Sequence, residues 1–216
     1  MNMTGNYKDR TITSDDCNLF FTSDTHFGSE RALELSRRPF KSVEEMDETM
    51  LKNINDMCKV TDKAYLVHLG DFGNHEFVRR INVPVILILG NYEMKEIEDG
   101  FNGDYKAYRR CLMDRFGYAD IAIHAEIESH GNRDLWLAHD PIECVNNRDN
   151  SRRFVNQKSP NGVFYLFGHI HGRQKVKPFG IDVGVDGNHF RPMPLKDVWF
   201  YENAIRNHYD KSVWCQ

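Results

Sequence analysis

Short apolar runs alternate with stretches of helical periodicity along the chain, and this pattern predicts a fold that mixes buried strands with amphipathic helices. The clearest run, residues 85–89, holds five consecutive apolar side chains and no polar face, as in a strand covered on both sides. The same kind of run predicts further core strands at residues 18–21, 63–69, 134–138, 162–167 and 181–185. Residues 118–127 alternate between apolar and polar side chains and predict one more strand.

Helices are predicted between these strands. In residues 42–58 the apolar side chains recur near the helical period, and Ser42 with Glu45 has the pattern of a capping box. The acidic side chains of this segment are interpreted as a solvated face. The other predicted helices are residues 29–38, 75–80 (capped by Asn74), 104–116 and 194–210. Residues 95–103 are polar and interrupted by glycine, so a loop is expected there.

Length and composition favour one folded unit. The chain has 216 residues, of which 40% are hydrophobic and 12% aromatic, enough to bury a sizeable core. No Pro-, Gly- or Ser-rich linker and no internal repeat divides the chain. We therefore expect a single domain over residues 1–216. The oligomeric state is left open by the sequence.

Charge and cysteine usage narrow the choice of partners and compartment. A net charge of -4 argues against nucleic acid or an anionic membrane as a partner, although it leaves room for a local basic groove. Five widely spaced cysteines without a C-x-x-C pair favour free thiols in a reducing cytoplasm. The polar start lacks the apolar region of a signal peptide, and no apolar run approaches the roughly 20 residues of a membrane span. A cytoplasmic location away from membranes is expected.

Polar side chains follow several of the predicted strands, at the point where each strand ends. In chain order these are Asp24 and His26, Asp71, Asn91, His139, and His169 with His171. Ligand sites in α/β sheets lie beyond the carboxyl ends of the strands, and carboxylate, imidazole and amide groups can share a metal ion. Asp-x-His and Gly-Asn are weak signals alone, whereas two histidines one residue apart between glycines are a stronger one. His68 lies inside a strand and is interpreted as a hydrogen-bonded core residue.

The order Asp-x-His, Gly-Asp, Gly-Asn, Ala-His and Gly-His-x-His resembles the motifs of the calcineurin-like metallophosphoesterase superfamily, in particular its small bacterial and bacteriophage members. The resemblance covers about residues 20–186. It implies a four-layer α/β/β/α sandwich with a dinuclear metal site at the strand ends. It assigns one metal to Asp24, His26, Asp71 and His171. It assigns the other to Asp71, Asn91, His139 and His169, so that Asp71 bridges the two.

Dinuclear chemistry of this kind is consistent with the residue types. Two divalent ions roughly 3.5–4 Å apart can lower the pKa of a bridging water and neutralise a phosphoryl group during in-line attack. Mixed Asp, His and Asn ligation suits Mn²⁺, Fe or Zn²⁺ better than the all-oxygen shells that Mg²⁺ and Ca²⁺ prefer. Two divalent ions are therefore the expected cofactors, with Mn²⁺ the first choice.

Tyr92 departs from the pattern of the resembled family. The third motif of that family is usually Gly-Asn-His followed by Asp or Glu, whereas this chain reads Gly90-Asn91-Tyr92-Glu93. The missing histidine is thought to assist the leaving oxygen, and a phenol with an ordinary pKa of about 10 is a poorer proton donor than an imidazolium. Three interpretations stay open. The tyrosine contacts the substrate, another residue such as His75, His189 or an arginine of residues 148–153 supplies the proton, or most catalysis has been lost.

Residues 146–161 are the one distinctly basic and polar segment, and they lie between two strand-end histidine motifs. Arg148, Arg152 and Arg153 are therefore candidates, with Tyr92, for binding the substrate phosphate. A solvated surface loop is an equally good interpretation of the same segment.

The leading function is a metal-dependent phosphoric ester hydrolase in which Asp71, Asn91 and Tyr92 act at the reacting phosphoryl group. A small nucleotide-type phosphodiester is the expected substrate, because some small members of the resembled family that replace the same histidine are associated with diesters. A metal-dependent nuclease and a catalytically weakened binding module with the same fold are the alternatives.

Overall fold

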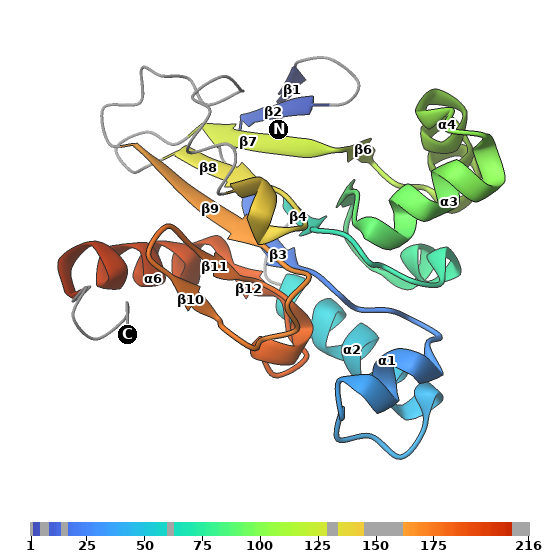
Figure 1. The fold of residues 1–216 in the computed structure, drawn as a ribbon, viewed down its shortest axis with the longest axis horizontal. Helices are drawn as coiled ribbons and strands as arrows, with labels where there is room; N and C mark the ends of the chain where they lie inside the picture. Colours follow the sequence, from blue (N-terminus) through green and yellow to red (C-terminus); the bar gives the residue numbers. More distant parts are fainter. Residues whose placement is uncertain are drawn as a thin grey trace.

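Two β-sheets form the centre of the molecule, and helices lie against them (Figure 1). The computed structural model describes residues 2–4, 9–13, 17–59, 63–128, 134–144 and 162–208. The α/β fold with one largely parallel and one mixed sheet is consistent with a metallophosphoesterase, so the predicted fold class is confirmed.

The first sheet has five strands in the order β12-β3-β4-β5-β6. Its four parallel strands are β3 (Asn18–Thr22), β4 (Ala64–His68), β5 (Val85–Ile88) and β6 (Asp120–Ala122). The short strand β12 (Met193–Pro194) pairs antiparallel with β3 at one edge. Because β3, β4 and β5 run in the same direction, their carboxyl ends meet at one edge of the sheet.

The second sheet has seven strands in the order β1-β2-β7-β8-β9-β11-β10. They are β1 (Asn2–Thr4), β2 (Asp9–Thr13), β7 (His124–Glu128), β8 (Asp134–Leu137), β9 (Val163–Phe167), β10 (Val176–Lys177) and β11 (Gly180–Asp182). Strands β8, β9 and β11 are parallel neighbours. The bridge between Ser23 and Gly184 joins the two sheets at the end where the candidate ligands lie.

The main core fills the space between the sheets. Fully buried side chains such as Phe21, Val67 and Ile86 of the first sheet belong to one apolar cluster with Leu135 and Leu166 of the second. Both sheets are therefore stabilised by the same burial of apolar area.

Helices cover the other face of the five-stranded sheet. They are α1 (Glu30–Leu35), α2 (Val43–Cys58), α3 (Asn91–Phe101) and α4 (Tyr105–Phe116), with the 3-10 turn η1 (His75–Arg80) between β4 and β5. A second turn, η2 (Val185–Gly187), precedes β12. Helix α6 (Leu195–His208) lies beside β10, β11 and β12, away from α3 and α4 (Figure 1). Among the described residues, no helix is long and apolar enough to cross a membrane.

The predicted caps Ser42 and Asn74 are confirmed, because each accepts a hydrogen bond from the first turn of the helix it precedes. Ser29 and Asp104, predicted as the first residues of helices, are N-caps of the same kind, and α1 and α4 begin one residue later. The capping box at α2 is only half formed, because the Glu45 carboxylate accepts from the backbone N–H of Lys41 rather than of Ser42.

The predicted loop at residues 95–103 is wrong, because α3 runs through it. The helix begins at Asn91, directly after β5, where Glu93 accepts from the backbone N–H of Gly90. Ile97 supplies a buried apolar contact, and Gly100 lies in the exposed last turn, where it costs the helix little.

Two strand predictions also need correction. The predicted strand 118–127 is two strands, β6 and β7, which belong to different sheets, so the chain crosses from one sheet to the other near Ile123. Strands β1 and β2 were not predicted, because their residues are mostly polar. Of β2, Ile12 is fully buried.

Asp47 is an exception to the predicted solvated acidic face of α2. Its carboxylate is buried, where Oδ2 accepts from the backbone N–H of Gly28 and Oδ1 has no hydrogen-bond partner in the described structure. Burial raises the pKa of Asp47 from its ordinary value to about 6. Ionising this side chain therefore costs folding free energy.

The first prediction concerns this carboxylate. A folded-state pKa above the unfolded value means that stability is lost as the pH rises from about 4 through about 6. Asp47→Asn keeps an acceptor for Gly28 and removes the charge, so it should raise the free energy of unfolding at pH 7.5 by about 1 kcal/mol and leave it unchanged near pH 4. Urea denaturation at both pH values measures the effect, with exposed Asp99→Asn as the control. An equal effect at both pH values would contradict the interpretation.

Candidate metal centre

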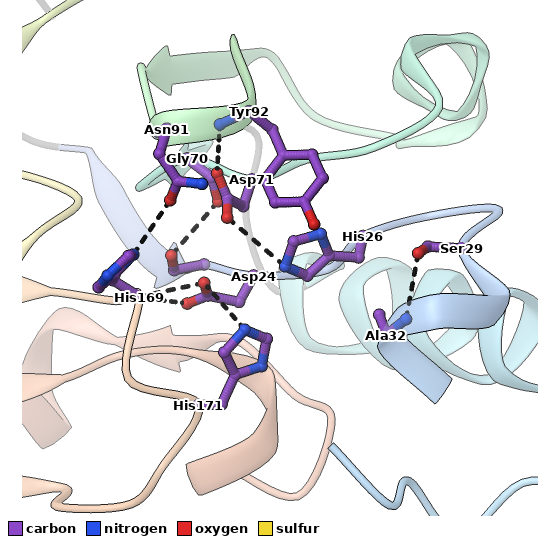
Figure 2. A network of polar contacts seen from close by, with 12 residues as sticks. Asp24, His26, Ser29, Ala32, Gly70, Asp71, Asn91, Tyr92, His169 and His171 are labelled. Carbon is purple, nitrogen blue, oxygen red and sulfur yellow. Dashed lines mark hydrogen bonds and ion pairs between the residues drawn. The ribbon is translucent and has the colours of Figure 1, made fainter. Parts of the chain in front are cut away.

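The seven predicted ligands are brought together at one edge of the two sheets. Three strands of the five-stranded sheet and two of the seven-stranded sheet end there. Asp24 and His26 follow β3, Asp71 follows β4, Asn91 is the first residue of α3 after β5, His139 follows β8, and His169 and His171 follow β9. Segments far apart in sequence thus meet at a single site (Figure 2).

Five of these residues have a left-handed backbone, which side chains other than glycine rarely adopt. The φ values are 57° at Asp24, 48° at His26, 57° at Asp71, 70° at His169 and 50° at His171. Each such residue costs of order 1 kcal/mol and persists only where the surrounding fold imposes it. The abrupt turns after the strands therefore aim the side chains into one space at a cost in stability.

Asp24, His26 and His171 form the first cluster of donor atoms. Their ligand atoms lie within 4.8 Å of one another, and the Asp24 carboxylate is fully buried. The imidazole rings of His26 and His171 stack with centroids 5.3 Å apart. Asp71 Oδ2 lies 3.6 Å from His26 Nε2 on the other side of the cluster. The arrangement matches the donor set expected for the first metal.

Asn91, His139 and His169 form the second cluster. Asn91 Oδ1 lies 3.0 Å from both His139 Nε2 and His169 Nδ1, and these two nitrogens are 3.2 Å apart. Asp71 Oδ2 is 3.5 Å from His139 Nε2, so its carboxylate faces both clusters. Asp24 also groups with Asp71 and His139 within 4.8 Å, which places a second carboxylate between the two clusters.

The direction of the lone pairs fits bound cations. His139 Nδ1 is 2.7 Å from the carbonyl oxygen of Leu69, which can only accept, so Nδ1 carries a proton. In the neutral ring, Nε2 then presents a lone pair toward the oxygen of Asn91. Two acceptors so close repel each other unless a proton or a metal ion lies between them. The buried donors of the second cluster therefore fit a divalent ion.

A similar contact orients His171. Its Nδ1 is 2.8 Å from Asp186 Oδ2, which leaves Nε2 directed at Asp24 Oδ1, 3.8 Å away. Arg38 is buried and holds Asp186 through two hydrogen bonds of 2.9 Å. Such outer partners fix the tautomer and orientation of a metal-binding imidazole.

Glu93 ties the ends of β4 and β5 together. Its carboxylate, 1% exposed, accepts from the backbone N–H groups of Asp71 at 2.9 Å, Phe72 at 2.8 Å and Gly90 at 2.8 Å. A Cβ at Gly90 would collide with the Asp71 side chain, so glycine permits this close approach. Glu93 thereby fixes the backbone on which Asp71 is carried.

Burial, hydrogen bonds and neighbouring charges together set the pKa values of the central side chains when no cation is bound. It raises the pKa of Asp71 to about 7 and lowers that of His26 to about 4. The pKa of His171 is raised by its hydrogen bond to Asp186. His139 also has a raised pKa, because the nearby Asp24 and Asp71 carboxylates outweigh the opposing effect of burial. A bound cation would reverse the effect at Asp71 by favouring the carboxylate.

An open cleft of about 410 Å³ leads to these side chains. Tyr92 lines it and is 43% exposed, and its ring meets that of His26 edge-on at 5.0 Å (Figure 2). Arg31, Arg37 and Arg173 line the same cleft. They were missed in the sequence, because single exposed arginines carry no signal before the cleft is known.

The remaining candidates for the reaction do not meet the metal cleft or fall outside the structure. His75 is within hydrogen-bond distance of Tyr118 and Glu96, and His189 lines a separate hollow. Neither histidine is among the described residues that line the metal cleft. Arg148, Arg152 and Arg153 lie outside the described residues. His68 is fully buried and hydrogen-bonded to Thr25, as expected of a core histidine.

The second prediction concerns Glu93. In Glu93→Gln the amide NH₂ must face at least one of the three backbone donors, which loses a charge-assisted hydrogen bond and leaves two donors opposed. We expect the free energy of unfolding to fall by about 2 kcal/mol and the affinity for Mn²⁺ to fall about 10-fold. Chemical denaturation in EDTA and calorimetric titration of Mn²⁺ measure the two effects. Exposed Glu98→Gln on the same helix is the control, and equal behaviour of the two variants would disprove the role.

Comparison with known proteins places the chain in a family. Residues 18–178 match the calcineurin-like phosphoesterase superfamily domain. An uncharacterized protein of Methanocaldococcus jannaschii is 29% identical over 130 residues, which are 56% of this chain and 66% of that protein. The alignment therefore spans just under two thirds of that relative.

The fold has a counterpart among solved structures. The crystal structure of a protein of unknown function from Aquifex aeolicus aligns with a TM-score of 0.58 and 23% identity, covering 86% of this chain and 99% of that one. This similarity supports the fold alone. From the match over most of its length, the chain belongs to the calcineurin-like phosphoesterase superfamily, whose members hydrolyse phosphoesters with the help of metal ions.

Proposed function

We propose that this protein is a dinuclear-metal-dependent phosphodiesterase that acts on a small nucleotide-type ester. The observation that carries the proposal is the convergence of Asp24, His26, Asp71, Asn91, His139, His169 and His171 on two adjoining clusters at the base of an open cleft. No other group of three or more His, Cys, Asp or Glu side chains in the described residues has comparable geometry.

The chain's own residues have distinct tasks in this scheme. Asp24, His26, Asp71 and His171 would hold one ion, and Asp71, Asn91, His139 and His169 the other, with Mn²⁺ preferred for the mixed nitrogen and oxygen donors. Bound ions of this kind supply a water of lowered pKa and neutralise charge on the phosphoryl group. The cleft, lined by Tyr92 and His169, positions the ester above these donors.

Tyr92 is proposed as a substrate contact rather than a proton donor. Its ring is exposed at the cleft and contacts the His26 ring edge-on. In this position it can stack against a base or an aromatic leaving group. A leaving group of low pKa, such as a substituted phenol, needs little acid assistance, whereas a sugar alkoxide needs more. The diesterase is favoured because small members of the resembled family that replace the same histidine are associated with diesters.

The third prediction tests the metal site through Asp71→Asn. The neutral amide resembles the protonated acid that burial favours, so the metal-free variant should be as stable as the wild type or more stable. Bound Mn²⁺, measured by elemental analysis, should fall from two ions toward one or none. Hydrolysis of bis(p-nitrophenyl) phosphate should fall at least 100-fold. Exposed Asp114→Asn is the matched control.

Other outcomes of this experiment would redirect the proposal. The diesterase function would be ruled out if the Asp71 variant still hydrolysed bis(p-nitrophenyl) phosphate, or if the wild type did not hydrolyse it with any divalent ion. Absence of bound metal in the wild type would favour a binding module. Faster digestion of single- or double-stranded DNA than of small diesters would favour a nuclease.

The fourth prediction concerns Tyr92→His. If the missing imidazole limits protonation of the leaving group, this variant should hydrolyse phenyl phosphate, whose phenol has a pKa of about 10, about 10-fold faster than the wild type. Tyr92→Phe is the companion variant, because it keeps the ring and removes the hydroxyl. An unchanged or lower monoesterase rate in Tyr92→His would show that protonation is not limiting.

A further inference from the structure

Three exposed arginines, called the rim arginines below, line the metal cleft together with Tyr92. Arg31 lies on α1, Arg37 follows the C-terminus of that helix, and Arg173 lies two residues after His171. Two separate segments of the chain thus contribute positive charge to the same 410 Å³ space as the predicted metal ligands.

The described part of the fold does not engage these guanidinium groups. Within the described part of the chain, no ion pair or side-chain hydrogen bond involves Arg31, Arg37 or Arg173. By contrast, Arg38 pairs with Asp186, and Arg109 pairs with Asp120. The rim arginines are therefore available to an external anion.

The backbone of Arg37 is fixed against the metal site. Its φ of 50° is left-handed, a conformation that glycine would adopt at lower cost. On one side, Ser36 Oγ is 3.1 Å from His171 Nδ1. On the other, buried Arg38 donates to the backbone oxygens of Asp24 at 2.6 Å and Thr25 at 2.8 Å. Arg37 is thus held beside the ligands in a strained conformation, although its side chain makes no hydrogen bond or ion pair with the described residues.

The charge of the cleft exceeds what one diester needs. Asp71 is the single carboxylate among the described residues that line the cleft, and metal ions would neutralise it. A phosphodiester carries one negative charge, which the ions also offset. The protein has a net charge of -4, so three additional arginines in one cleft are a local concentration of positive charge. Their planar guanidinium groups suit phosphate oxygens.

We propose, resting on the function above, that the substrate carries a second phosphate, which Arg31, Arg37 and Arg173 bind while the scissile ester lies over the metal donors. The cleft volume of about 410 Å³ favours a small bisphosphorylated compound of nucleotide type as the source of this second phosphate. An adjacent backbone phosphate of a nucleic acid has the same chemistry, and the experiment separates the two sources.

The fifth prediction compares two chromogenic esters with Mn²⁺. One is the p-nitrophenyl ester of thymidine 5′-phosphate, and the other is the same ester with a second phosphate on the 3′-hydroxyl. The wild type should show a KM about 10-fold lower for the bisphosphorylated ester, and the difference should shrink at high salt. Arg37→Gly and Arg173→Gln should each raise that KM about 5-fold or more and change the KM of the first ester less than about 2-fold.

Stability and binding supply independent readouts. Arg37→Gly should leave the melting temperature unchanged or higher, because glycine accepts the left-handed backbone. Exposed Arg110→Gln on α4 is the control and should change neither KM. Calorimetric binding of thymidine 3′,5′-bisphosphate and thymidine 5′-phosphate to the Mn²⁺-loaded protein should show the same preference without turnover, and the arginine variants should lose it.

Failure of the proposed diesterase and failure of the second-phosphate site give different results. If neither ester is hydrolysed but the bisphosphate still binds about 10-fold more tightly, the proposed diesterase fails and the second-phosphate site stands. If both esters are hydrolysed with equal KM and both nucleotides bind equally, the second-phosphate site is disproved and the diesterase stands. If a short oligodeoxynucleotide has a higher kcat/KM than the bisphosphorylated ester, the small-molecule source is overturned in favour of nucleic acid.

Discussion

Charged oxygen atoms buried next to one another are the constraint on which the arrangement of this protein depends. Asp24, Asp71 and Glu93 are almost fully removed from water within one connected set of contacts. A buried carboxylate is tolerated only where hydrogen bonds or cations compensate for lost hydration. Backbone N–H groups supply the compensation for Glu93 completely and for Asp24 and Asp71 in part. The uncompensated remainder faces the imidazole groups and defines the space suited to divalent ions.

The two-sheet architecture makes this grouping possible. Burial of the apolar side chains between the sheets raises the free energy of unfolding, and the strained turns at the strand ends lower it. The division is visible along single strands: the buried β5 is followed within three residues by Asn91 of the metal cluster. Stability and chemistry thus reside in adjacent but separate parts of each strand–turn segment.

Much of this was predictable from local patterns. The run at residues 85–89 predicts β5 because no polar face interrupts it, and the positions of the ligand motifs follow from the strand ends. Helix α3 was missed because its N-cap is Gly90, which has no side chain to signal a cap, and because Glu93 in the first turn has its other partners on the β4 loop, distant in sequence. The split between β6 and β7 was missed because alternation reveals a strand but not the sheet to which it belongs. The rim arginines and the Arg38–Asp186 pair depend on tertiary proximity, which a single sequence does not encode in any local pattern.

The Glu93 contacts carry a consequence for the thermodynamics of metal uptake. In many small metal-binding domains the ion orders the chain, and much of its binding free energy is consumed in doing so. Here the Glu93 carboxylate joins the loops after β4 and β5 through hydrogen bonds from backbone N–H groups, so the contacts that hold these loops together do not use the donor atoms of the metal clusters. The conformational entropy of assembling the site has therefore been lost when the sheets form. An arriving ion therefore contributes mainly by relieving the electrostatic repulsion between the donor atoms. Its binding free energy is not consumed in ordering the site, because the backbone has already fixed the positions of the donors.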